Sequence, residues 1–154
     1  MAHALNLTLK IRQDAAAKAT LEAVKADFAS KIQPAIDAAL RKSEIVHFAR
    51  VLVIDDLYLQ VLTEYDGDHF GYTEFFRKEL TQVFGLLFSL AEKPIDPSAL
   101  GDSQKFFEFS KNLQVRALGD ATDGDQGQDG NLAGYLFSAY GNKEVKEIKG
   151  ALGL

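Results

Sequence analysis

The stretch from Ile45 to Tyr65 is the part of the sequence that most restricts the fold. It is a long run without a helical period, and it is rich in Val, Ile, Leu and Tyr, which favour β-strands. The pair Asp55-Asp56 divides the run near its middle. Two strand-like halves around a short polar turn predict a β-hairpin.

The register of this hairpin decides which side chains share a face of the sheet. A two-residue turn at Asp55-Asp56 places Ile54 opposite Leu57. The predicted core face then has Arg50 as its charged exception and otherwise holds Phe48, Leu52, Ile54, Leu57, Leu59, Val61 and Tyr65. The other face is mixed, like the lining of a cleft, and holds His47, Ala49, Val51, Tyr58, Gln60, Leu62 and Glu64. Asp-Asp is a weaker turn signal than Asn-Gly, so a shift by one residue is the alternative.

Before the hairpin, the sequence predicts one strand and one long helix. Apolar residues alternate with polar ones from Leu5 to Ile11, the period of a strand with one buried face. Apolar residues then recur every three or four positions as far as about Lys42, which indicates an amphipathic helix. Pro34 removes a backbone donor, so we expect this helix to kink or restart there.

After the hairpin, Asp68 is placed to cap a long helix from about His69 to Ala91. Two prolines interrupt the chain, and a shorter helix is expected from Ser103 to about Arg116. The rest of the sequence predicts an acidic, Gly-rich loop, a final strand and one closing helical turn, over residues 118–131, 132–140 and 143–149.

This order of elements predicts one α+β domain over residues 1–154, with the βαββαβ plan of the ferredoxin-like fold and an extra helix before the last strand. Helices would cover one face of a four-stranded sheet. The mixed face is too apolar for plain solvent, so we expect it to pack on a second subunit or to enclose a ligand.

Composition excludes several classes of function. The net charge is −5 and no Lys/Arg cluster stands out, which argues against a nucleic-acid partner. There are no cysteines, so disulfides, thiolate metal sites and cysteine nucleophiles are excluded. We find neither a signal peptide nor an apolar run long enough to cross a membrane, and we expect a cytoplasmic protein without a membrane partner.

The run HFARVLVIDD, the YDGD before an aromatic helix and the late FSAY resemble small bacterial proteins of the dimeric α+β barrel superfamily. The likeness spans the hairpin, the start of the second long helix and the last predicted strand. It implies two ferredoxin-like units that pair sheet to sheet, with a pocket between each sheet and its helices or loops. The superfamily includes cofactor-independent monooxygenases of the antibiotic-biosynthesis type, haem-binding peroxidases, isomerases and ligand-sensing domains, so the fold does not select the function.

His47 and Arg50 are the two unusual residues of the hairpin. His47 is a candidate general base or axial haem ligand, and the alternative is a histidine paired with Glu64 at a strand end or subunit contact. Arg50, predicted on the core face, would need either a ligand carboxylate or an internal acidic partner.

Metal sites are weakly indicated. His69 beside Asp66 and Asp68 offers three potential ligands, but capping explains Asp68 well. The acidic residues of the loop at 118–131 do not have the spacing of a calcium-binding loop. We therefore expect no metal and no required cofactor, with haem as the alternative.

The sequence favours a homodimer that binds a small, largely apolar organic molecule. Catalysis is left open: the hypotheses are a monooxygenase-like enzyme, a non-catalytic ligand-binding or structural dimer, and a haem protein. His47 is the candidate catalytic residue, and the candidate ligand-binding residues are Arg50, Tyr58, Gln60, Glu64, Tyr72 and Phe76.

Overall fold

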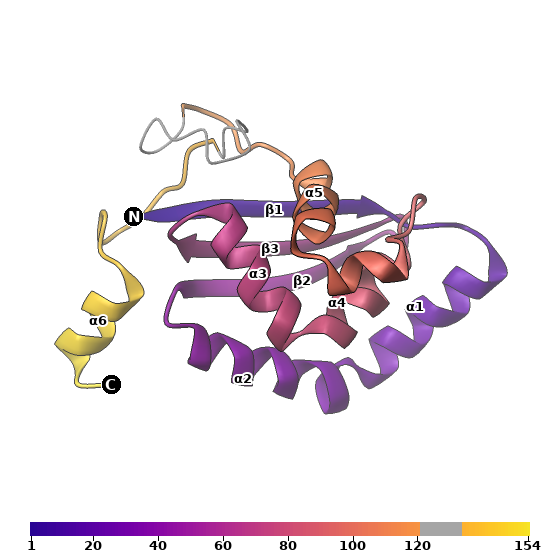
Figure 1. Cartoon of the computed structure of the whole chain (residues 1–154), viewed down its shortest axis with the longest axis horizontal. Coiled ribbons are helices and arrows are strands. Elements are labelled where there is room, and N and C mark those ends of the chain that lie inside the picture. The colour runs from indigo at the N-terminus through magenta and orange to yellow at the C-terminus, as the bar shows by residue number, and fades with distance from the viewer. Residues whose placement is uncertain (121–133) are drawn as a thin grey trace.

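The computed structural model describes residues 1–120 and 134–154, and it is an α+β protein with one antiparallel sheet (Figure 1). The strands β1 (Ala2–Lys10), β2 (Val46–Ile54) and β3 (Tyr58–Asp66) lie in the order β1-β3-β2. The described helices are α1 (Ala15–Asp27), the π-helical turn η1 (Phe28–Ile32), α2 (Gln33–Ser43), α3 (His69–Glu79), α4 (Thr81–Phe88), the 3-10 helix η2 (Pro97–Gly101), α5 (Ser103–Leu113) and α6 (Val145–Leu152).

The first strand and the first helix are confirmed. Leu5, Leu7 and Leu9 of β1 are buried, as the alternation predicts. The Asp14 side chain caps α1 by accepting a hydrogen bond from a backbone amide. The predicted restart is also present, because the η1 turn separates α1 from α2 and Pro34 lies in the first turn of α2, where its missing donor costs nothing.

The hairpin is confirmed, but its predicted register is wrong by one residue. Ile54 pairs with Tyr58, not with Leu57. Asp55 and Asp56 both adopt left-handed backbone angles, with φ of 52° and 55°, and the Leu57 amide donates to the Ile54 carbonyl over 2.9 Å. The tight turn therefore forms at the predicted pair, and Leu57 adds one residue before pairing begins.

This shift exchanges the two faces of β2. Ala49 and Val51 share the helix-covered face with their partners Thr63 and Val61. Arg50 is not on the core face as predicted. The opposite side, here called the open face, carries Phe48, Arg50, Leu52, Ile54, Tyr58, Gln60, Leu62 and Glu64.

The predicted long helix over residues 69–91 is two helices. The backbone of Leu80 leaves helical geometry, with φ of −128° and ψ of 33°, and α4 restarts at Thr81. The Thr81 hydroxyl donates to the Arg77 carbonyl at this break. The predicted cap at Asp68 is confirmed, since its carboxylate accepts the Gly71 amide over 2.7 Å.

The predicted final strand is wrong where the structure describes it, because residues 134–140 have no strand pairing. The edge of β1 that such a strand would use is already occupied. The Val115 amide donates to the Asn6 carbonyl over 2.9 Å, and the Glu92 amide donates to the Lys10 carbonyl over 2.9 Å. Residues 132 and 133 lie outside the described residues, and the predicted closing helical turn is confirmed as α6.

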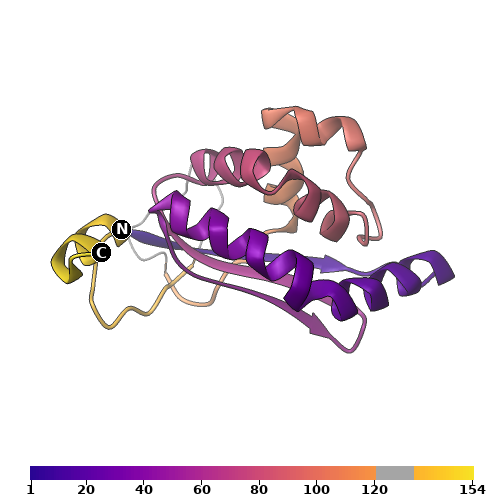
Figure 2. The same ribbon diagram turned by 90° about the horizontal axis from the view of Figure 1, so that it is seen from below.

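The helices divide the two faces of the sheet unequally (Figure 2). The helices α3, α4 and α5 lie above one face, where the aromatic core of Phe76, Phe84, Phe88 and Phe106 packs. In residues 1–120 and 134–154 no helix covers the open face, although residues 136–140 pass one end of it. None of the described helices is both long and apolar enough to cross a membrane.

Candidate functional site

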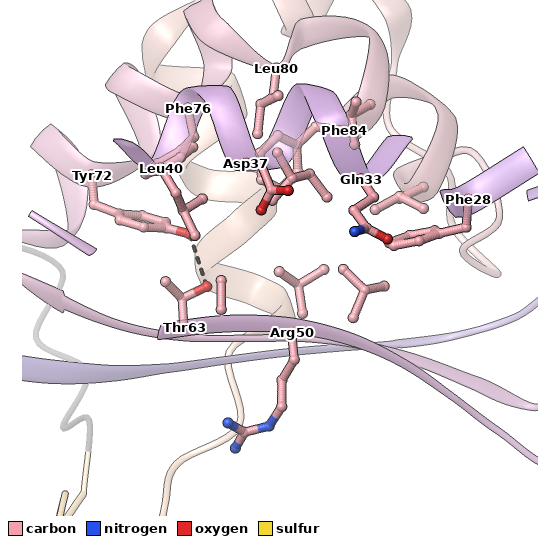
Figure 3. Close-up of a pocket in the computed structure, with 16 residues that line it drawn as sticks. Phe28, Gln33, Asp37, Leu40, Arg50, Thr63, Tyr72, Phe76, Leu80 and Phe84 are labelled. Atoms are coloured by element: carbon pink, nitrogen blue, oxygen red, sulfur yellow. Dashed lines mark hydrogen bonds between the residues drawn. The ribbon is translucent and has the colours of Figure 1, made fainter. Parts of the chain in front are cut away.

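A cavity of about 330 Å³ lies between the covered face of the sheet and two layers of helix (Figure 3). Its floor is made of small or branched side chains of β2 and β3, namely Ala49, Val51, Val61 and Thr63. One wall comes from η1 and α2, and the other from α3, Leu80 and α4. Because Ala49 is small and α2 buries only Ala39 fully, this corner of the core is left unfilled.

The walls of the cavity are apolar and aromatic. Tyr72 and Phe76 of α3, Phe84 of α4 and Phe28 of η1 contribute rings, and aliphatic side chains complete the lining: Ile36, Leu40, Leu80, Val83 and Leu87. A pocket of this composition suits the apolar body of a small organic molecule.

Two hydroxyl groups lie inside the cavity. The Tyr72 hydroxyl donates a hydrogen bond to Thr63 Oγ1 over 3.1 Å (Figure 3). Burial raises the pKa of Tyr72 to about 12, although the hydrogen bond between Tyr72 and Thr63 acts the other way. The phenol is therefore neutral at physiological pH, and the pair can orient a polar group of a ligand by hydrogen bonding.

Asp37 and Gln33 lie at the mouth of the cavity. They are one helical turn apart on α2, and both side chains point toward the space between helix and sheet (Figure 3). Sequence reasoning missed both residues, as well as Thr63. One signal was available, since the same helical face carries Gln33, Ile36, Asp37 and Leu40. From the sequence alone this face cannot be distinguished from an ordinary amphipathic stripe that packs on a core.

The predicted ligand-binding residues separate into two groups. Tyr72 and Phe76 line the cavity. Arg50 borders it only from behind, because its side chain points away, through the open face (Figure 3). Tyr58, Gln60 and Glu64 also lie on the open face, where Gln60 donates to Thr8 over 3.1 Å and Glu64 is 3.9 Å from Arg50.

His47 lies away from the cavity, at a bulge where β2 has one extra residue between Val46 and Phe48. Its partner is Asp66 rather than Glu64: Nε2 is 3.0 Å from Asp66 Oδ1, and both side chains are almost completely buried. The other ring nitrogen is 3.5 Å from the Tyr140 hydroxyl. His47 borders two surface hollows, one against α6 and one against residues 136–140.

Asp66 connects this histidine to the C-terminal helix. Its Oδ2 accepts the Val145 amide over 2.8 Å at the start of α6. The N-terminal ammonium group lies 3.9 Å from Oδ1. The His47–Asp66 pair therefore links β2, β3 and the start of α6.

The second histidine near acidic residues packs inside the protein. His69 is buried, its Nε2 is 3.4 Å from the Ser110 hydroxyl, and its ring meets Phe107 edge to face. Within the described part of the chain, no group of three or more His, Asp or Glu side chains is arranged to hold a metal ion. Most of the acidic loop considered for calcium lies outside the described residues.

Comparison of the chain with protein-family models, curated proteins and solved structures finds no match. The cavity and the open face are therefore the evidence from which a function can be argued.

Proposed function

We propose that this protein binds a small, largely apolar organic molecule in the cavity between α2, α3, α4 and the sheet. The cavity itself is the observation that supports the proposal: about 330 Å³, apolar walls and a small number of polar groups are typical of ligand pockets. A core without a binding role would be expected to close such a space, because proteins pack their interiors densely.

Binding is favoured over catalysis. None of the described residues that line the cavity is a histidine, and His47 has an internal carboxylate partner elsewhere. Neither the monooxygenase-like hypothesis nor the haem hypothesis gains support from these positions, since each places a histidine beside the ligand.

We also propose that the protein is a homodimer through the open face, as in a dimeric α+β barrel but with three strands in the sheet. The open face exposes four large apolar or aromatic side chains, those of Phe48, Leu52, Ile54 and Tyr58. A patch of this kind is typical of an interaction surface rather than of a sheet face in contact with water. The open face also carries Arg50 and Glu64 side by side, a self-complementary pair for a two-fold contact.

The binding proposal can be tested with the neutral fluorescent probe N-phenylnaphthylamine. We expect saturable binding to the protein, weakened about tenfold or more by Ala49→Leu, because the larger side chain fills the floor of the cavity. Leu52→Phe is the matched control, since it adds bulk to the same strand on the open face. Equal affinity for the probe in all three proteins would show that the cavity is not the binding site.

A further inference from the structure

The charge that faces the cavity is negative. Of the described lining residues only Asp37 and Arg50 are charged, and they point to opposite sides of the sheet (Figure 3). Arg50 is 55% exposed on the open face, so its guanidinium does not reach a molecule inside the cavity. Asp37 alone sets the electrostatic preference of the mouth.

Asp37 also lacks the internal partner that its neighbours have. The other two carboxylates of the η1–α2 segment and its flanking residues are paired: Asp27 with Lys31 at 2.6 Å and Glu44 with Lys149 at 3.8 Å. In the part of the chain that the structure describes, no cationic side chain lies within 4.0 Å of the Asp37 carboxylate. The Asp37 carboxylate is therefore available to a ligand that enters the cavity.

We infer that the ligand carries a protonated amine on an apolar, aromatic-sized body, with the ammonium group held at Asp37. This inference rests on the proposed ligand-binding function. An ammonium group has three donors, and the Asp37 carboxylate and the Gln33 amide oxygen, one helical turn apart, are acceptors for two of them. The Phe28 ring lies beside Gln33 at the mouth (Figure 3), and an aromatic face attracts a cation.

The same geometry disfavours an anionic ligand. A carboxylate at the mouth would lie close to Asp37, and among the described lining residues no cationic group points into the cavity to offset the repulsion. Toward the floor, the hydroxyl groups of Tyr72 and Thr63 are neutral and add no charge preference. The cavity therefore distinguishes ligands of one shape by the charge of their polar end.

Three ligands of similar size test this selectivity: phenethylamine, phenethyl alcohol and hydrocinnamate, which are cationic, neutral and anionic at neutral pH. Each is titrated against protein that is saturated with N-phenylnaphthylamine, and displacement is followed by fluorescence. Asp37 is exposed, so we expect the amine to bind about two- to fivefold more tightly than the alcohol, and the anion to bind most weakly. The preference for the amine should decrease as salt is added, because its source at the open mouth is ionic.

Asp37→Asn should remove the preference while keeping the shape of the mouth. Glu22→Gln is the matched control: it removes an exposed helical carboxylate of α1 outside the cavity, which pairs with Lys25 over 3.0 Å. Equal displacement by all three ligands from wild-type protein, or a preference that survives Asp37→Asn, would overturn the amine inference and leave cavity binding intact. Failure of the probe and of all three ligands to bind would overturn the proposed function itself.

Discussion

Tyr72 is the residue whose titration reports most directly on the cavity. Burial raises its pKa from 10.0 to about 12, so its neutral form is favoured in the folded state. Its contribution to stability is complete below pH 10 and is lost as the pH rises through about 12. We expect Tyr72→Phe to remove one tyrosine from the late part of the ultraviolet titration of the native protein.

Tyr58→Phe is the control for this titration, because Tyr58 lies on the open face and is partly exposed. It should leave this late titration in place. If Tyr72→Phe left the number of late-titrating tyrosines unchanged, Tyr72 would not be the buried phenol that lines the cavity.

Arg50 and Asp37 show what sequence reasoning could and could not give for the site. Tyr72 and Phe76 were predictable, because an aromatic helical stripe identifies the wall of a core or pocket. Arg50 was placed on the wrong face, since the register depended on one extra residue at Leu57 that composition does not reveal. That single shift moves Arg50 from the predicted core face to the open face, and Asp37 is then the charged side chain that points into the cavity among the described lining residues.

At the scale of elements, α3 is tied to the segment before α5 by one arginine. Arg77 donates to both oxygens of Glu74, over 2.8 and 2.9 Å, and to the Leu100 carbonyl over 2.8 Å. Both side chains are mostly buried, and the pair holds the pKa of Glu74 well below its usual range. The contribution of this carboxylate is therefore present above its unfolded pKa of 4.5 and is lost as the pH falls below that value.

We expect Glu74→Gln to lower the free energy of unfolding by about 1 to 2 kcal/mol at neutral pH. The difference from wild type should shrink as the pH falls below 4.5, because wild-type Glu74 then begins to be protonated in the unfolded state. Urea denaturation at several pH values measures this difference. A difference that stayed constant down to strongly acidic pH would show that the ion pair is not its origin.

The C-terminal helix α6 depends on an anchor at its start. No residue of α6 is buried, and the Asp66 carboxylate joins the Val145 amide to His47. We expect Asp66→Ala to cost about 1 to 3 kcal/mol, since it leaves a buried histidine without its acceptor, and to abolish the protection of α6 amides from hydrogen exchange. Asp102→Ala, which removes the cap of α5, should leave α6 protected. Unchanged exchange in Asp66→Ala would mean that other contacts hold the helix.

The elements themselves were largely predictable, and each error in their prediction has a physical cause. Strand alternation, helical periodicity and the caps at Asp14 and Asp68 identify β1, α1, α3 and the hairpin. Neither proline nor glycine lies at Leu80, so the sequence does not predict the helix break there. The predicted fourth strand does not form because backbone amides of Val115 and Glu92 already donate hydrogen bonds to the free edge of β1. These residues are far from β1 in the sequence, so no local pattern reveals the competition.

At the scale of the whole molecule, helices cover one face of the sheet and leave the other open. The exposure of apolar side chains on the open face needs an explanation. Phe48 is 61% exposed on the open face, beside Leu52 and Ile54, and the Arg50–Glu64 pair lies among them. A two-fold contact between two open faces would bury these apolar side chains and bring each Glu64 near a cation of the other copy. It would leave the cavity, on the opposite side of the sheet, accessible in both copies.

Light scattering of the purified protein should therefore give the mass of two chains, and Phe48→Glu should give the mass of one, because a carboxylate would be desolvated in the contact. Leu118→Glu is the matched control, since Leu118 is 91% exposed but lies outside the open face. A single-chain mass for the wild-type protein would rule out the dimer. Dissociation by Leu118→Glu with Phe48→Glu still dimeric would place the interface elsewhere, while the cavity would remain the binding site in either case.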